Sequence, residues 1–219
     1  LAEIILVRHG QAQSRATDAA SYDRLSPLGH DQSRWLGQYF HETGAHFDRV
    51  VSGGLLRHRQ TVSAMGNGYA EALVLDPRLD EFDYFALGHI LARDHGVAFP
   101  ENPAAFATHV PRLIEAWQEG ILRDAPESFA SFEARVAAAL EDLARPGGRV
   151  LVITSGGVIG MVARLMLGLG PEGQARMMLP ILNSSVHKVE ALHDRSYLAQ
   201  YNAAPHLEHP GRAHARTFV

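Results

Sequence analysis

The chain of 219 residues contains no cysteine. This absence excludes disulfide bonds, thiol nucleophiles and thiolate metal sites. The chain also lacks an excess of positive charge, since 20 Lys and Arg stand against 24 Asp and Glu, for a formal net charge of -4. Nucleic-acid and membrane-surface binding usually need a basic face. We therefore expect neither partner, although a local cationic pocket is compatible with this balance.

Long apolar runs are absent as well. The most apolar helical stretch, residues 158–169, is interrupted by Arg164 and is too short to cross a bilayer. It is better interpreted as a core helix. Residues 1–7 lack the basic start and the cleavage region of a secretory signal, and we expect a cytoplasmic protein.

Metal and nucleotide motifs are missing in spite of 13 histidines. The sequence has no His-Glu-x-x-His motif and no paired carboxylate spacing, and we interpret His206, His209 and His214 as solvated residues of a polar tail. The pair Gly156-Gly157 fits neither the Gly-x-Gly-x-x-Gly pattern nor the P-loop pattern. We expect no metal and no cofactor.

What the sequence does contain indicates an α/β fold. A hydrophobic content of 46% is enough for one substantial core, so we predict a single domain over residues 1–219. Residues 4–7 and 150–153 are continuous apolar runs rich in β-branched residues, typical of strands buried on both faces of a parallel sheet. Each is followed by glycine and a helical pattern. We predict a mainly parallel sheet flanked by helices on both faces.

Other elements follow from periodicity and from helix-start and turn residues. We predict further strands at 50–51, 186–192 and 197–202, helices at 27–40, 55–65 and 132–143, and an irregular polar C-terminus. Residues 82–126 have weaker periodicity and contain one predicted helix, at about 111–119. We interpret 82–126 as an insertion.

Arg8-His9-Gly10 directly follows the first apolar run. Ligands bind at the carboxyl ends of strands in open α/β sheets. A guanidinium offers a planar fork of donors for phosphate or carboxylate, and an imidazole can act as nucleophile, base or proton donor near neutral pH. This position therefore predicts chemistry on an anion.

Further segments occur in the order found in the histidine phosphatase superfamily, also called phosphoglycerate mutase-like, whose Arg-His-Gly signature the first motif resembles. Residues 25–32 resemble the family's Leu-Thr-x-x-Gly-x-x-Gln segment, and residues 52–61, with Arg57 and Thr61, resemble its second phosphate-binding segment. Residues 77–81 are similar to its Leu-x-Glu acid motif. Residues 150–157 occupy the place of its strand followed by His-Gly, but Ser155 stands where the family has histidine.

The resemblance implies a phosphoglycerate mutase-like fold with a cap at residues 82–126, and it implies a role for each matching residue. His9 would be the phosphoryl acceptor and Glu81 the general acid, with Asp80 and Asp83 as rival candidates for the acid. The residues expected to bind the phosphate or the substrate are Arg8, Arg57, Ser155, Gly156 and, by a looser match to the family, Gln11, Ser14 and Arg15. For Arg57 the alternative is a solvated charge like Arg59, and for Thr61 it is helix packing.

Ser155 is the main departure, because serine donates only a neutral hydrogen bond. Losing one preorganised donor typically costs about a hundred- to a thousand-fold in rate. His58, which stands where the family usually has a small residue, and His187 are candidates to replace the missing group. We nevertheless interpret both as surface histidines. Replacing Ser155 by histidine should raise turnover if the pocket is otherwise productive.

The predicted function is metal-independent hydrolysis of a small phosphomonoester through phospho-His9. A mutase, which must retain its phosphoryl group in a closed pocket, fits less well. The alternative from another class is a noncatalytic phospho-ligand-binding or regulatory protein, which Ser155 favours. Intact His9 and Glu81 favour an enzyme, since a pure binder needs neither nucleophile nor acid. The oligomeric state and the natural substrate do not follow from the sequence.

Overall fold

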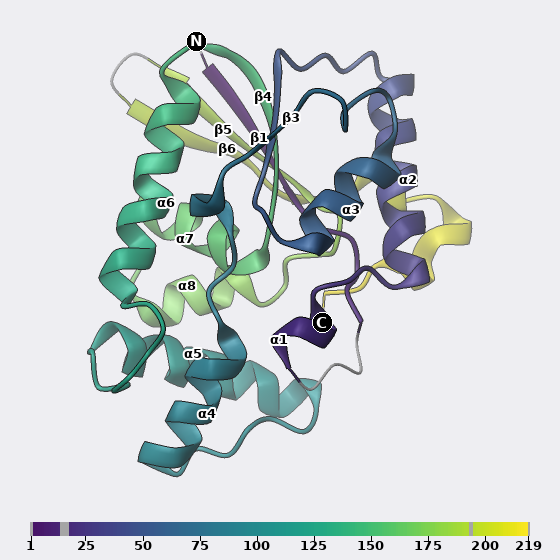
Figure 1. Ribbon diagram of the computed structural model, residues 1–219. Coiled ribbons are helices and arrows are strands. Elements are labelled where there is room, and N and C mark those ends of the chain that lie inside the picture. Colours follow the sequence, from purple (N-terminus) through teal and green to yellow (C-terminus); the bar gives the residue numbers. More distant parts are fainter. Residues whose placement is uncertain (1, 14–17, 193–194, 219) are drawn as a thin grey trace.

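A six-stranded sheet lies at the centre of the computed structural model, which describes residues 2–13, 18–192 and 195–218 (Figure 1). Its strand order is β3-β2-β4-β1-β5-β6. The strands are β1 Ala2–Arg8, β2 Arg49–Ser52, β3 Leu73–Leu75, β4 Gly148–Thr154, β5 Val186–Leu192 and β6 Arg195–Ala203. β1 to β4 are parallel, β5 is antiparallel to β1, and β6 is antiparallel to β5. The predicted mainly parallel sheet is confirmed.

The register of the central strands brings the Arg8-His9-Gly10 motif close to the segment Ser155-Gly156-Gly157. Arg8 of β1 pairs with Thr154 of β4, and the next amide, that of His9, donates to the Thr154 carbonyl at 2.9 Å. On the other side of β4, Ser52 of β2 pairs with Ile153. Because these three strands are parallel, the loops that follow them leave the same edge of the sheet.

Helices cover both faces of the sheet, as predicted. α2 (Pro27–Glu42) and α3 (Leu56–Met65) cover one face, and α6 (Phe129–Ala144) and α7 (Gly156–Leu167) cover the other (Figure 1). Side chains alternate along a strand: Ile5 of β1 packs in the cluster with α2 and α3, whereas Ile4 packs in the cluster with α6 and α7. Both faces of β1 are therefore buried, which explains the unbroken apolar run at residues 4–7.

Residues 82–126 contain two helices, where only one was predicted. α4 (Tyr84–His95) begins at the N-cap Asp83 and ends at the left-handed Gly96, and it was missed. α5 (Pro103–Gln118) begins eight residues before Pro111, where the prediction placed its start. Asn102 caps α5 and Pro103 occupies its first turn, so Pro111 lies inside the helix and removes a single backbone hydrogen bond. α8 (Pro171–Met178), also missed, packs against α5.

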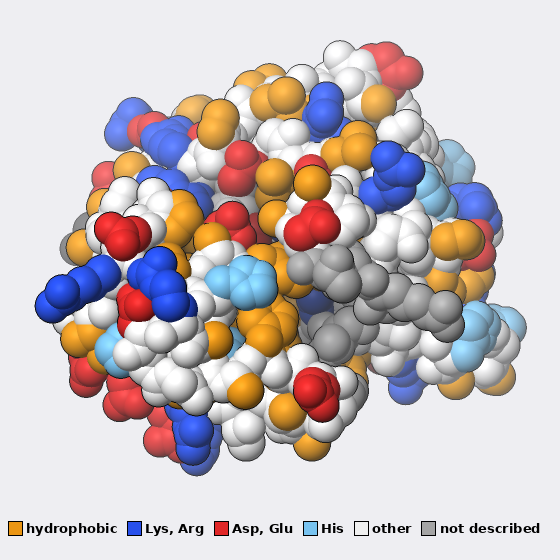
Figure 2. Space-filling view, turned by 60° about the horizontal axis from the view of Figure 1, so that its bottom comes forward, with side chains coloured by type: hydrophobic (Ala, Val, Ile, Leu, Met, Phe, Trp, Pro, Cys, Tyr) orange, Lys and Arg blue, Asp and Glu red, His pale blue; other side chains and the backbone are white. Residues whose placement is uncertain are grey.

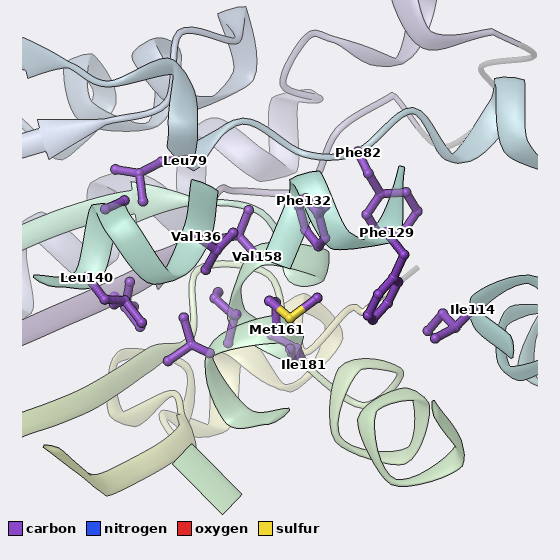
Figure 3. Packing of buried hydrophobic residues seen from close by; sticks show 14 of the residues in the cluster. Leu79, Phe82, Ile114, Phe129, Phe132, Val136, Leu140, Val158, Met161 and Ile181 are labelled. Atoms are coloured by element: carbon purple, nitrogen blue, oxygen red, sulfur yellow. The ribbon is translucent and has the colours of Figure 1, made fainter. Parts of the chain in front are cut away.

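Aromatic side chains join this segment to the helices on the sheet (Figure 3). The ring of Phe82 lies 5.1 Å from that of Trp117 and 5.5 Å from that of Phe132, between ring centroids. Phe129 and Ile114 belong to the same buried cluster. α5 thus shares its core with α6 and with the sheet.

The C-terminal residues are packed, so the prediction of an irregular tail is wrong. Two 3-10 helices, Pro205–Leu207 and Pro210–Ala215, bury Leu207 and Ala215 against α2. Gln32 of α2 donates to the Ala215 carbonyl at 2.8 Å. His206, expected to be solvated, is buried, and its Nε2 lies 2.8 Å from the Oγ of Ser184. This packing returns the chain to the end of β1, near α1 (Ala19–Tyr22).

Candidate active site

A cavity of about 300 Å³ lies where β1 and β4 end. It brings together side chains or backbone from five of the predicted site positions, namely Arg8, His9, Arg57, Glu81 and Gly156. Seen from the end of the molecule that carries α4 and α5, apolar side chains gather around the middle of this face (Figure 2). The cavity therefore has a charged inner end and an apolar approach.

His9 is held in one orientation. Its Nδ1 atom lies 2.7 Å from the Gly10 carbonyl, which can only accept, so the proton belongs on Nδ1 and the lone pair on Nε2. The side chain is buried, and burial, followed by the charges of Arg57 and Arg8, holds its pKa well below 6.5. The imidazole is thus neutral at neutral pH, with Nε2 available as a nucleophile.

Gly10 allows the loop after β1 to lie against α2. A Cβ atom at this position would stand 2.3 Å from the Gly29 carbonyl oxygen and 2.8 Å from the Ser33 Oγ. The Gly10 amide donates to Thr61 Oγ1 at 3.1 Å, and Thr61 donates in turn to the Arg57 carbonyl at 2.8 Å. Thr61 therefore connects the His9 loop to α3, and its contacts are those of a packing residue.

Arg57 lies in the first turn of α3 and contacts three site residues. Its Nε donates to His9 Nε2 at 3.2 Å, its Nη1 to Asp23 Oδ1 at 3.0 Å, and its Nη2 to Ser155 Oγ at 3.4 Å. The Asp23 carboxylate also accepts from the backbone amides of Leu56 and Arg57, at 2.9 and 3.1 Å. It therefore fixes both the helix start and the guanidinium.

Sequence reasoning did not identify Asp23. Its carboxylate and the Arg57 guanidinium are 34 positions apart in the chain, and no spacing rule connects them. The only local signal is its position just before residues 25–32, the segment that starts α2.

Arg8 is anchored by the far end of the chain. Its Nη1 donates to the carbonyls of Ile181 and Phe218. Its Nε is buried and has no hydrogen-bond partner among the residues that the structure describes. A Cβ built on Gly156 would lie 3.7 Å from this Nε, in ordinary contact. A buried donor without an acceptor is costly, and an anion in the cavity would supply one.

Glu81 accepts two backbone hydrogen bonds. Its Oε2 accepts from the Gly157 amide at 2.8 Å and its Oε1 from the Phe82 amide at 3.1 Å. Burial raises the pKa of this carboxyl, against the opposing effect of the Gly157 amide. A Cβ on Gly157 would stand 2.1 Å from Glu81 Oε1, so this approach requires glycine.

The two rivals of Glu81 have different surroundings. Asp80 accepts from the Gly54 amide at 2.6 Å and does not line the cavity. Asp83 does line it, but its Oδ1 caps α4 by accepting from the Ala86 amide at 2.9 Å. Of the three carboxyl groups, Glu81 combines a place in the cavity with a raised pKa.

Ser155 is fully buried and pairs with His58. It occupies the N-cap position of α7 without capping the helix, and its Oγ lies 2.6 Å from the Nε2 of His58. Burial holds the pKa of His58 well below 6.5. The interpretation of His58 and His187 as surface histidines is wrong, because both are fully buried. His187 pairs with Ser185 at 3.0 Å and does not line the cavity.

The remaining residues predicted to contact the substrate are Gln11, Ser14 and Arg15. The Oε1 of Gln11 accepts from the Ser26 Oγ at 2.7 Å, and Gln11 does not line the cavity, whereas Gln13 does. This placement does not favour substrate binding by Gln11. Ser14 and Arg15 lie outside the described residues.

The described residues contain no group of three or more His, Cys, Asp or Glu placed to hold a metal ion. Among the same residues, no helix is long and apolar enough to cross a membrane.

Comparison with known proteins identifies the family and the proteins that share the fold. Residues 4–204 match the histidine phosphatase superfamily (branch 1). The chain is 26% identical over 193 residues to a probable phosphoglycerate mutase of Enterobacter sp. (strain 638), covering 86% of this chain and 84% of that protein. It is 25% identical over 199 residues to a broad-specificity phosphatase of Saccharomyces cerevisiae, covering 87% of this chain and 80% of that protein. A solved structure of phosphoserine phosphatase from Entamoeba histolytica, in complex with phosphoserine, has the same fold (TM-score 0.67, 17% identity, covering 94% of this chain and 100% of that chain).

Proposed function

Because this chain belongs to the histidine phosphatase superfamily, we propose that it is a metal-independent phosphomonoester hydrolase that acts through a phosphohistidine on His9. The observation that carries the proposal is the state of His9. Its Nδ1 is tied to the Gly10 carbonyl and its pKa is lowered, so a neutral Nε2 shares one cavity with Arg8, Arg57 and Glu81. That set supplies a nucleophile, two cations and an acid.

In the first step His9 Nε2 attacks phosphorus, and the bond from phosphorus to the alcohol oxygen breaks. Arg8 and Arg57 hold the equatorial oxygens, and the Arg57 Nε that now donates to His9 turns to the phosphate. Glu81, whose raised pKa favours the protonated form, gives its proton to the departing oxygen. In the second step the Glu81 carboxylate takes a proton from water, which attacks phosphorus and releases phosphate from the histidine.

Ser155 takes the position of the family's second histidine in this proposal, and His58 supports it from α3. The Ser155 Oγ accepts from Arg57 Nη2 and pairs with His58 Nε2. These contacts give Ser155 and His58 the role of positioning Arg57. In this proposal the arginines and the backbone at Gly156, which line the cavity, contact the phosphate directly.

The competing proposal is a noncatalytic phospho-ligand-binding protein of the same fold. The neutral, oriented His9 and the Glu81 carboxyl in the same cavity favour the hydrolase, since binding alone requires neither.

The test is turnover of a panel of phosphomonoesters, including an activated aryl phosphate, in the presence of a chelator. Acid-quenched samples are examined for phosphohistidine by mass spectrometry, with His9→Ala as the control. His9-dependent hydrolysis with a labelled His9 supports the hydrolase. Phosphate binding without turnover or label in the wild-type protein contradicts it and favours the binder.

A further inference from the structure

We infer that the substrate of this site is the phosphate ester of an apolar, ring-bearing alcohol rather than of a small, multiply charged metabolite. The inference rests on the proposed function and names its substrate class. It is carried by the chemistry of the cavity beyond His9 and the two arginines, where aromatic side chains from five separate segments meet.

The rings begin at the phosphate end and continue outward. The centroid of the Tyr22 ring lies 6.4 Å from that of the His9 ring and 6.1 Å from that of the Phe85 ring. The guanidinium carbon of Arg57 lies 5.1 Å from the same Tyr22 centroid. Phe85 and Phe99 follow, with ring planes only 13° apart and centroids separated by 5.9 Å. A row of packed apolar rings, with Phe85 and Phe99 stacked, thus leads away from the phosphate position.

The polar atom of the next ring is already satisfied. The hydroxyl of Tyr84 lies 3.0 Å from His109 Nδ1, and its ring packs on those of Phe85 and Phe99. Tyr84 therefore adds a ring surface to the cavity. Phe106, whose ring lies 5.4 Å from that of Tyr84, extends the same surface from α5.

Charge in the cavity disfavours a second anionic group on the substrate. Among the described residues that line it, the Lys and Arg side chains are Arg8 and Arg57, both at the phosphate end. Two carboxyl groups, Glu81 and Asp83, line it as well. A carboxylate carried a few atoms from the phosphate, as in phosphoserine, would leave water for rings and carboxyl groups, which costs free energy.

The size of the expected preference follows from apolar transfer. One apolar group that enters an apolar pocket typically changes kcat/KM by about 10- to 100-fold. We therefore expect kcat/KM to rise by about that factor from ethyl phosphate to benzyl phosphate, and to rise again or hold for 2-naphthylmethyl phosphate. All three esters release a primary alcohol, so differences in leaving-group chemistry stay small. Phosphoserine should fall below ethyl phosphate.

The test measures this series and, separately, the binding of benzylphosphonate and methylphosphonate by calorimetry, which needs no turnover. Phe99→Ala and the milder Phe85→Leu should each lower the ratio of kcat/KM for benzyl phosphate to kcat/KM for ethyl phosphate, by up to about tenfold. His9-dependent turnover of ethyl phosphate should persist in both variants. Tyr197→Ala removes an exposed aromatic side chain of β6 outside the cavity and serves as the control.

The outcomes separate the two proposals. His9-dependent turnover with a flat series, or with phosphoserine preferred, overturns the substrate class and leaves the hydrolase intact. Loss of His9 dependence across the series, with benzylphosphonate still bound about tenfold or more tightly than methylphosphonate, overturns the hydrolase and supports the ligand class. Equal binding of the two phosphonates overturns the ligand class in either case.

Discussion

The Nε2 atom of His58 lies 2.6 Å from the Oγ of Ser155, and neither side chain is exposed to solvent. The histidine comes from the first turn of α3 and the serine from the start of α7. The ring of His58 is enclosed on its other side, because a Cβ on Gly53 would stand 2.4 Å from its Nδ1. A small residue at 155 and a large one at 58 therefore fill one space between two helices.

Exchanging these two residues tests whether they substitute for each other. The His58 ring, 2.6 Å from the Ser155 Oγ, leaves no room for an imidazole at position 155. Contrary to the expectation from the sequence, Ser155→His alone should therefore not raise turnover, and it should lower stability by about 1–3 kcal/mol through overpacking. The double variant His58→Ser, Ser155→His removes the clash and places a histidine at the α7 start. We expect its kcat/KM to exceed that of the single variant by about tenfold or more. Steady-state kinetics and thermal unfolding check both; equal activity of the two would refute the space-sharing argument.

Asp23 should control Arg57 rather than the fold as a whole. Asp23→Asn keeps a hydrogen-bond acceptor but removes the charge that pairs with Arg57 at 3.0 Å, in a pair whose arginine side chain is almost buried. We expect kcat/KM to fall by about 10- to 100-fold. Asp31→Asn breaks the exposed pair with Arg34 and is the matched control, with little expected effect. A loss shared by both variants would point to general destabilisation.

Gly157 should tolerate no side chain. A Cβ at 157 would stand 2.1 Å from Glu81 Oε1 and 2.4 Å from the Phe82 ring, so Gly157→Ala must displace the carboxyl group from the Gly157 amide. Loss of a correctly placed general acid costs about 10²- to 10⁴-fold. Gly170→Ala, at the start of α8, is the control, because among the described residues no atom beyond the chain neighbours of Gly170 lies within 4 Å of the added carbon. Kinetics together with a crystal structure of the Gly157 variant would show whether Glu81 has moved.

The sequence identifies the residues at the strand ends better than it identifies the residues that orient them. Arg8 and His9 are readable because β1 is buried on both faces, which leaves an unbroken apolar run that marks where the strand ends. Asp23 and His58 carry no such mark. Their roles depend on contacts with partners 34 and 97 positions away, and burial of a single histidine has no periodic pattern.

The missed α4 and the missed C-terminal 3-10 helices both lack a regular local pattern of apolar residues, for different reasons. The apolar residues of α4 are divided between the core and the cavity, so they form no single stripe: Leu87 and Leu91 are buried in the core, whereas Phe85 lines the cavity. The C-terminal 3-10 helices bury few large side chains and are held by α2, as in the hydrogen bond from Gln32. Such long-range contacts leave little trace in a local sequence pattern.

The pH profile should identify the general acid. Burial keeps His9 neutral to well below pH 6.5 and keeps Glu81 protonated to higher pH than an ordinary glutamate. For an alkyl phosphate, kcat/KM should thus be highest on the acid side and fall as pH rises and Glu81 loses its proton. Glu81→Gln should remove this descending limb and cost about 10²- to 10⁴-fold, with a smaller loss for 4-nitrophenyl phosphate, whose leaving group needs no proton.

Asp80→Asn is the comparison for this experiment, because burial also raises the pKa of Asp80. The variant should retain the descending limb of the wild-type profile. A limb that disappears with Asp80→Asn and persists with Glu81→Gln would transfer the acid role to Asp80.

Acid should destabilise the fold through its buried histidines. Burial lowers the pKa of His187 from 6.5 to about 3, so between these values the unfolded chain binds a proton that the folded chain does not. The stabilisation is complete above pH 6.5 and is lost as pH falls, by about 1.4 kcal/mol of unfolding free energy per pH unit for this group.

His187→Asn, which keeps an acceptor for the Asn202 amide, should reduce the pH slope of urea unfolding by about one proton. His209→Asn is the matched control, because exposed His209 likewise accepts from a backbone amide, that of Gly211. An unchanged slope in His187→Asn would show that His187 gains its proton in the folded protein as readily as in the unfolded chain.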